Sequence, residues 1–395
     1  MKILTVDIGT GTQDIFLYDS NLDLENGFKL VLPSPTMMVH RRLKQATLSR
    51  TPILLTGHQM GGGPSAWAIE AHARAGIPVY MTPDAATTLN DELDKVEALG
   101  IKIVSEDETN GLPSAVHRLE LKDLDFPAIS EVFGRFGVLL NGLAAVAVAV
   151  FDHGNAPAGA SDRQFRFDYL DERIRARNSL SAFAYPSADI PKIMTRLQAV
   201  ADSATKLNCP LVVMDTAPAA ILGACFDPVV AKRERKIIIN VGNFHTLAFR
   251  LGDGIEGVFE HHTGEIDLPK LETYIRAIAD GSLKHQDVFD DMGHGALIYG
   301  KQPFEFGRDE FDIVVTGPRR NLFNQKSHIE NRKSSVVNRK SLIPYYAVPF
   351  GDMMLAGCFG LLAATAEVMP DLTETIQGSL REAGAQGHGA APWEG

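Results

Sequence analysis

Cysteine is scarce in this sequence. Only Cys209, Cys225 and Cys358 occur among 395 residues, and their spacing forms neither a CxxC nor a CxxxCxxC motif. Such a set excludes a disulfide framework, a cysteine-based zinc site and the three-cysteine motif that holds an iron–sulfur cluster. Scattered thiols are typical of proteins from a reducing compartment.

Long apolar runs are also missing. The chain reaches Asp7 after only four uncharged residues, whereas a signal peptide needs about 7–15 apolar residues. The longest apolar stretch, residues 138–151, is interrupted by Asn141 and Gly142, and it is shorter than the roughly 20 residues that cross a bilayer. We therefore expect a cytoplasmic protein without a membrane-spanning segment.

Positive charge is in the minority. The 38 lysines and arginines stand against 49 aspartates and glutamates, which gives a formal net charge of −11. A negative chain repels the phosphates of nucleic acids and of anionic membranes, so neither is expected as a partner. With 45% apolar and 22% charged residues the composition is that of an ordinary globular protein, and a chain of this length usually forms two domains. The expected partners are a small molecule or another protein.

Two segments of the chain have the same design. DIGTGTQDIFLYD, which begins at Asp7, and NVGNFHTLAFRLG, which begins at Asn240, each predict a strand end, a short glycine turn and a second strand. A strand is also predicted before each turn, at residues 2–8 and 236–239. The match indicates an internal repeat, that is, duplication of one α/β unit.

The remaining elements follow from short β-branched runs and amphipathic runs. The predicted strands lie at residues 14–18, 29–32, 52–56, 78–81, 101–104, 143–151, 211–214, 246–251, 255–260 and 311–315. The predicted helices lie at residues 65–75, 85–99, 189–207, 268–279 and 353–368.

Two glycine motifs resemble the nucleotide loops of other folds but fail in their details. Gly9 begins a GxGxxG pattern, yet Asp14 occupies its sixth position, and a strand follows where the dinucleotide-binding motif requires a helix. Residues 295–301, GALIYGK, fit GxxxxGK, but Gln302 follows and offers no hydroxyl for magnesium. Both motifs are therefore excluded.

The turn from Asp7 to Thr12 has a better physical case. Backbone N–H groups in a tight turn form an anion site, small residues let a phosphate approach, and an adjacent carboxylate can hold magnesium through water. The alternative is a hairpin turn that binds nothing.

Five segments, in order along the chain, resemble the actin, hexokinase and heat-shock chaperone ATPase superfamily. They are residues 7–12 (first phosphate loop), 215–223 (first connecting helix), 240–243 (second phosphate loop), 313–320 (adenosine-binding strand and turn) and 352–364 (second connecting helix). The resemblance implies an α/β fold in which two RNase H-like domains close around a nucleotide cleft. The sequence also resembles a prokaryotic family labelled "putative pyruvate formate-lyase activating enzyme". Without CxxxCxxC, that likeness implies the fold and the nucleotide site rather than glycyl-radical formation.

The superfamily resemblance implies roles for single residues, with ATP and Mg²⁺ as cofactors. Asp7 would be the metal ligand, and Asp7, Asp152 and Asp215 the catalytic carboxylates, although Asp215 has helix capping as its alternative role. The second loop of the superfamily usually carries Asp where Asn240 stands here. The implied nucleotide-binding residues are Gly9, Thr10, Gly11, Thr12, Asn240, Gly242, Asn243, Thr316, Gly317 and Arg320.

The resemblance also implies domain limits. We expect a first domain at residues 1–227 with an inserted αβ segment near 36–140, a second domain at 228–352, a connecting helix at 353–370 that returns to the first domain, and a flexible tail at 371–395. The second domain carries a basic insertion near 321–343, in which NRKS occurs twice. A solvated insertion and a binding patch are both open.

Small residues recur on the two connecting helices. Ala356, Gly360 and Ala364 are spaced by four residues, as are Ala220 and Ala224. This predicts a smooth stripe on each helix, which serves either a hinge between domains or ordinary close packing.

Two further polar segments have open roles. The glycine turn at residues 57–63 resembles the substrate-side turn of carbohydrate kinases, or is a plain loop. His261 and His262 are adjacent and should point to opposite faces of a strand, so they are not expected to share a metal ion.

Three functions are compatible with the sequence. The first is ATP hydrolysis or phosphoryl transfer with domain closure. The second is ATP-dependent activation or reactivation of a partner enzyme, and the third is nucleotide sensing with little turnover.

Overall fold

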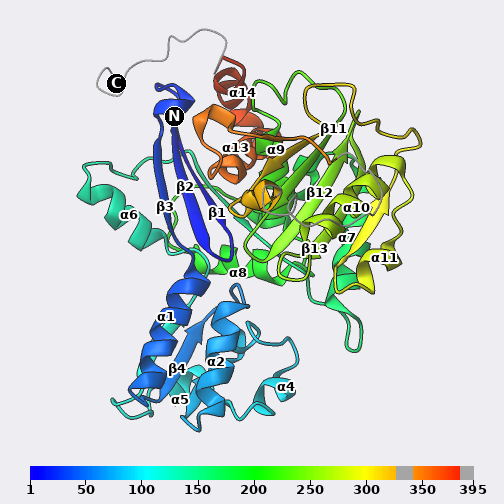
Figure 1. The fold of residues 1–395 in the computed structure, drawn as a ribbon. Helices are drawn as coiled ribbons and strands as arrows, with labels where there is room; N and C mark the ends of the chain where they lie inside the picture. The colour runs from blue at the N-terminus through cyan, green and yellow to red at the C-terminus, as the bar shows by residue number, and fades with distance from the viewer. Residues whose placement is uncertain (326–340, 383–395) are drawn as a thin grey trace. The chain divides into compact units, whose positions relative to one another are not determined.

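The chain forms two compact units, whose helices and strands are labelled in Figure 1. A computed structural model describes residues 1–325 and 341–382. The first unit comprises Met1–Leu17, Lys29–Gly159 and Tyr185–Met214, and the second comprises Tyr18–Phe28, Ala160–Ala184 and the chain from Asp215 onward. Each unit is thus assembled from separate segments of the sequence.

The sheet that carries the N-terminus has six strands in the order β3-β2-β1-β8-β10-β9. They are β1 (Lys2–Ile8), β2 (Thr12–Asp19), β3 (Phe28–Pro33), β8 (Ala145–Val150), β9 (Ala184–Pro186) and β10 (Leu211–Asp215). β1 pairs in parallel with β8, from Ile3 opposite Ala145 to Asp7 opposite Ala149. All six residues of β8 are buried, as is typical of a strand covered on both faces of a sheet.

A smaller sheet is inserted between β3 and β8, with four strands in the order β6-β5-β4-β7. Its strands are β4 (Ile53–Gly57), β5 (Val79–Met81), β6 (Lys102–Ile103) and β7 (His117–Leu121), and all neighbours pair in parallel. The helices of the insertion are α1 (Pro35–Leu48), α2 (Pro64–Arg74), α3 (Pro83–Ala86), α4 (Leu93–Glu97), α5 (Glu106–Thr109) and α6 (Phe126–Arg135). α1 and α2 lie side by side (Figure 1). Leu43 and Ile69 of these helices share a buried core with Leu55 of β4.

Two predicted helices are shorter than expected. The prediction at residues 85–99 is wrong, because only α3 and α4 form, and Asn90 between them accepts the N–H of Glu92 on its side chain at 2.9 Å. Such local side-chain hydrogen bonds compete with the helix. The prediction at residues 189–207 shrinks to α8 (Thr195–Ser203), since Pro191 disfavours helical backbone at the residue before it.

The sheet of the second unit also has six strands, in the order β14-β13-β12-β11-β15-β16. They are β11 (Lys236–Val241), β12 (His245–Leu251), β13 (Ile255–His262), β14 (Gly295–Ile298), β15 (Ile313–Thr316) and β16 (Pro344–Tyr346). β11 is antiparallel to β12 and parallel to β15. One face of this sheet packs on α10 (Leu268–Asp280), whose Leu271, Ile275 and Ile278 are buried with Ile239 of β11.

The first strand of each large sheet has equivalent neighbours. β1 lies between β2 and β8, and β11 lies between β12 and β15, with β8 and β15 as the parallel partners. Asp7 is opposite Ala149, and Asn240 is opposite Thr316 at the same end of the corresponding strand. The internal repeat is therefore confirmed, and the chain has the predicted α/β fold with two RNase H-like sheets.

The other helices of the second unit are α7 (Asp162–Ala176), α9 (Thr216–Ala224), α11 (His285–Phe289), α13 (Ala356–Val368) and α14 (Thr373–Glu382). Short 3₁₀ turns occupy Leu24–Asn26, Leu180–Phe183, Ser187–Asp189, Arg320–Gln325, Pro349–Gly351 and Pro370–Leu372. The flexible tail predicted from residue 371 is wrong for α14, where Ile376 and Leu380 are buried.

α9 and α13 pack closely at their glycines. A Cβ atom on Gly360 would fall onto the carbonyl oxygen of Ala219, and one on Gly223 would fall onto that of Ala356. The contact on α9 therefore runs through Ala219 and Gly223, each one position before the alanines that the sequence singled out. The predicted close packing is confirmed, and a hinge stays a prediction.

Residues 326–340, which hold the first NRKS copy, the first three residues of the second and most of the basic insertion, lie outside the described residues, as do residues 383–395. None of the helices in the part of the chain that the structure describes has the length and apolar character of a membrane-spanning segment.

Candidate functional site

The turn after β1 is closed by one backbone hydrogen bond and fixed by Ser34. The N–H of Gly9 donates to the carbonyl oxygen of Thr12 at 2.9 Å. The hydroxyl of Ser34 donates to the carbonyl oxygen of Thr10 at 2.6 Å, and its N–H donates to that of Gly11 at 3.2 Å. Ser34 is the N-cap of α1, so the start of this helix holds the turn in place.

Donor groups remain available in this turn. Among the described residues, the N–H groups of Thr10 and Gly11 have no protein acceptor. Asp7 lies two residues before Gly9 and is buried, with 8% of its surface exposed. Adjacent N–H groups beside a carboxylate are a donor set that suits a phosphate and its magnesium ion.

The turn after β11 repeats the same hydrogen bond. The N–H of Gly242 donates to the carbonyl oxygen of His245 at 2.9 Å, with Asn243 inside the turn. The hydroxyl of Thr263 donates to the carbonyl oxygen of Gly242 at 2.9 Å. A Cβ atom on Gly242 would lie 2.6 Å from the carbonyl oxygen of His245, so the turn requires glycine here.

Two buried oxygens without partners lie at the ends of β11 and β15. Asn240 and Thr316 are directly opposed in this parallel pair, and neither Oδ1 of Asn240 nor Oγ1 of Thr316 has a hydrogen-bond partner in the described chain. Gly317 has φ +96°, and a Cβ atom there would lie 2.6 Å from the carbonyl oxygen of Val241 and also collide with Oδ1 of Asn240. The structure therefore brings Asn240, Thr316 and Gly317 together.

Arg320 adds a buried donor to this loop. The N–H of Arg319 donates to the carbonyl oxygen of Val241 at 2.9 Å, which ties the loop after β15 to the end of β11. Nη1 of Arg320 is buried and has no partner within the described residues. Because guanidinium N–H groups only donate, this atom suits an anionic or carbonyl-bearing ligand.

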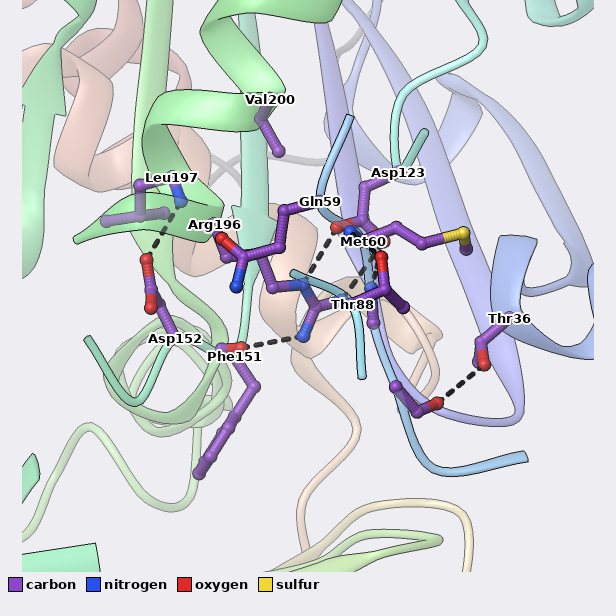
Figure 2. Close-up of polar contacts among 12 residues, drawn as sticks. Thr36, Gln59, Met60, Thr88, Asp123, Phe151, Asp152, Arg196, Leu197 and Val200 are labelled. Carbon is purple, nitrogen blue, oxygen red and sulfur yellow. Dashed lines mark hydrogen bonds and ion pairs between the residues drawn. The ribbon is translucent and has the colours of Figure 1, made fainter. Parts of the chain in front are cut away.

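Asp152 has a structural role at the end of β8. Its Oδ1 accepts the N–H of Gly154 at 2.8 Å, and its Oδ2 accepts the N–H of Leu197 in α8 at 2.9 Å. Arg196 donates to the neighbouring carbonyl oxygen, that of Phe151, at 2.6 Å (Figure 2). These contacts orient Asp152 on the backbone, and its catalytic role stays a prediction.

The glycine turn at residues 57–63 is held by an ion pair between half-buried Arg196 and buried Asp123 (Figure 2). Arg196 donates to both carboxylate oxygens of Asp123, at 2.8 and 3.1 Å, and Asp123 accepts the N–H of Gly61 at 3.2 Å. The N–H of Met60 donates to the hydroxyl of Thr88 at 3.1 Å. The turn is thus fixed from two sides, and its part in binding a substrate stays a prediction.

Asp215 belongs to a buried network of charges. It caps α9 by accepting the N–H of Ala217 at 2.9 Å, which confirms the capping alternative. Arg166 of α7 donates to Oδ2 of Asp215 at 2.6 Å and to Oε2 of Glu260 at 2.9 Å. Arg166 is fully buried, so one guanidinium holds two carboxylates away from water.

Burial shifts the acid–base equilibria of this network. Burial raises the pKa of Glu260 to about 7, against the opposing effect of Arg166. Burial alone would lower the pKa of Arg166, but Asp215 and Glu260 together raise it well above its ordinary value. Arg166 therefore stays charged, and its positive charge stabilises the two buried carboxylates.

The sequence missed Arg166 and Glu260. Arg166 lies on α7, for which no helix was predicted, although Phe167, Leu170 and Ile174 have the spacing of one buried helical face. Glu260 lies in a run of buried residues in β13. A charged residue within an apolar pattern was the sequence signal that could have located this network.

Comparison with known proteins identifies the family. A family model described as "Putative pyruvate format-lyase activating enzyme (DUF1786)" matches residues 60–322, about two thirds of the chain. None of the curated proteins matches the sequence.

Solved structures show distant likeness. An exopolyphosphatase-like protein is 10% identical, with 100% of this chain and 87% of that chain covered and a TM-score of 0.28. A ROK hexokinase from Thermus thermophilus is 12% identical, with 97% and 89% covered and a TM-score of 0.25. A ROK family transcriptional regulator, a homolog of the E. coli MLC protein, is 10% identical, with 97% and 70% covered and a TM-score of 0.23.

Proposed function

We propose that this chain, a member of the family described as "Putative pyruvate format-lyase activating enzyme", binds Mg-ATP and hydrolyses it or transfers its γ-phosphoryl group. The observation that carries the proposal is the pair of buried oxygens without partners, Oδ1 of Asn240 and Oγ1 of Thr316, at the ends of two parallel strands. Leaving a buried polar atom without a hydrogen bond costs about 1–3 kcal/mol. A ligand that pairs with both atoms would recover this free energy.

The residues present fit a nucleotide with its metal ion. The N–H groups of Thr10 and Gly11 can donate to phosphate oxygens, and the carboxylate of Asp7 can accept hydrogen bonds from metal-bound water. Gly317 lets the backbone after β15 pass close to Asn240, as an adenosine-binding turn requires. Magnesium, when bound, neutralises phosphate charge.

Asn240 sets the expected rate of hydrolysis. Its amide can orient a water molecule but adds no negative charge, so it polarises that water less than a carboxylate does. Asp152 and Asp215 both accept backbone N–H groups, so their carboxylates are held by the backbone. Because Asn240 adds no negative charge, basal ATP hydrolysis should be slow.

Asp7→Asn is expected to weaken magnesium-dependent ATP binding by at least about tenfold. The amide keeps the shape of a side chain that is only 8% exposed, so the fold should be retained while the charge that holds the metal is lost. Calorimetric titration of ATP with and without Mg²⁺ measures the effect. Asp19→Asn, at the far end of β2, is the matched control and should bind like the wild type. A folded Asp7→Asn protein with unchanged magnesium-dependent affinity would contradict the assignment of this loop.

Asn240→Asp is expected to raise basal ATP hydrolysis, and Asn240→Ala to lower nucleotide affinity. One preorganised polar contact is worth about 2–4 kcal/mol in a transition state, so the rise should be at least tenfold. The competing view is that Asn240 only shapes the turn. In that case the variants would differ in stability but have the same turnover per folded molecule. Steady-state rates, with folding checked by circular dichroism, separate the two views.

The family description names an activating enzyme of pyruvate formate-lyase. With three cysteines and no CxxxCxxC motif in the full sequence, we do not extend radical chemistry to this chain. The alternative that the description favours is an ATP-dependent activator or reactivase of a partner enzyme, and a nucleotide sensor is the third. Stimulation of ATP hydrolysis by one metabolite indicates a kinase, stimulation by a protein indicates an activator, and stimulation by neither indicates a sensor.

A further inference from the structure

Three histidine side chains meet at one edge of the second unit's sheet. His245 begins β12 and His262 ends β13, and the two residues are directly opposed in the antiparallel pair. His294 precedes β14, whose first residue, Gly295, pairs with Glu260. Residues opposed in an antiparallel pair project to the same face, so three neighbouring strands supply this histidine cluster.

The rings of the histidine cluster have the mutual spacing of metal ligands. The ring centroids are 5.1 Å apart for His245 and His262, 5.0 Å for His245 and His294, and 4.7 Å for His262 and His294. Metal–nitrogen bonds of about 2.0–2.1 Å place imidazole centroids about 3 Å from a tetrahedral ion and about 5 Å from one another. A ring nitrogen of His245 and one of His294 also lie within 4.8 Å of each other.

A buried carboxylate lies behind one of the rings. Oε1 of Glu260 is 3.3 Å from Nδ1 of His294, and the N–H of His294 donates to the carbonyl oxygen of Glu260 at 2.9 Å. Arg166 holds the same carboxylate with its Nε, 3.0 Å from Oε2. A carboxylate on one ring nitrogen orients a histidine whose other nitrogen binds a metal. Here Nδ1 of His294 lies on the side of Glu260, so Nε2 would be the ligand atom.

The neighbours of the cluster separate it from the adjacent histidine. The ring of Phe244 packs edge-on to His245 and His262, with centroids 5.0 and 5.7 Å away. His261 points to the opposite face, where its Nε2 contacts Asp291. His261 and His262 therefore point to opposite faces, as the sequence predicts, but the sequence missed that His262 meets histidines from two other strands.

We propose that His245, His262 and His294 bind one zinc ion and leave its fourth coordination position open. Three imidazoles with one open position are a ligand set that zinc accepts, and imidazole is a borderline donor that suits Zn²⁺ better than Mg²⁺ or Ca²⁺. His262 is not among the residues whose ligand atoms lie within 4.8 Å of those of His245 and His294, so its ring would have to turn about χ2 to aim a nitrogen at the ion.

The test is zinc binding by the full-length chain, purified without a histidine tag and stripped with a chelator. Isothermal titration with ZnCl₂ in the absence of nucleotide should give one site per chain. His262→Ala and His294→Ala should each weaken zinc binding by at least about tenfold. His117→Ala, an exposed histidine of β7 in the first unit, is the control and should bind zinc like the wild type.

Cobalt provides a second measurement on the same proteins. Co²⁺ bound to the wild type should show the intense visible bands of a four-coordinate ion, and His262→Ala should lose them while its circular dichroism is unchanged. A stoichiometry well below one, wild-type affinity in both cluster variants, or an equal loss in His117→Ala would overturn the proposal.

Discussion

Gly360→Ala is expected to destabilise the second unit by about 3 kcal/mol or more, although it adds only one methyl group. The new Cβ would fall onto the carbonyl oxygen of Ala219 in α9. α13 is buried from Ala356 to Ala366, so neither helix can move aside without opening the core on its other side. Urea unfolding followed by circular dichroism measures the loss.

Gly378→Ala is the matched control for this variant. Gly378 lies in α14, and a Cβ atom there would meet nothing within 4 Å. Alanine in an open helical position gains about 0.5–1 kcal/mol over glycine, so the control should be slightly more stable than the wild type. Equal stability of the Gly360→Ala and Gly378→Ala proteins would show that α9 and α13 separate without cost.

The strand–turn–strand pattern could be predicted because its determinants are local. β-Branched and apolar residues at 2–8 and 236–239 and the glycines at positions 9 and 242 suffice to place both hairpins. The structure adds the shared hydrogen bond of the two turns and the equivalent parallel partners of β1 and β11. The apolar runs and the turn glycines in this part of the sequence favour the same structure.

Contacts between distant segments could not be predicted in the same way. Arg166 and Glu260 are 94 residues apart, and although each lies among apolar neighbours in the sequence, nothing local shows that the two pair with each other. The stripe on α9 was misplaced by one residue because alanine and glycine are both small, and only the partner helix selects Ala219 and Gly223. The histidine cluster could not be predicted because pairing of neighbouring strands, and not adjacency in the sequence, brings its three members together.

Arg166→Met is expected to destabilise the protein by about 3–5 kcal/mol near neutral pH. The variant keeps much of the side-chain volume but leaves Asp215 and Glu260 buried without their shared cation. Burial already raises the pKa of Glu260 to about 7 in the presence of Arg166. Without the guanidinium, the pKa of Glu260 should rise further.

The sign of the pH dependence follows from the raised pKa of Glu260. A carboxyl group whose pKa is higher in the folded state favours folding when it is protonated, and this contribution is lost as the pH rises through the folded-state value. The loss of stability caused by Arg166→Met should therefore be smaller at pH 5 than at pH 8.

Denaturant unfolding at both pH values measures this loss of stability. Arg175→Met is the control, because Arg175 on the same helix pairs with Asp171 at the surface. That control should change little at either pH. A loss in Arg166→Met that is as small as in the control, or independent of pH, would mean that water or another group compensates the two carboxylates.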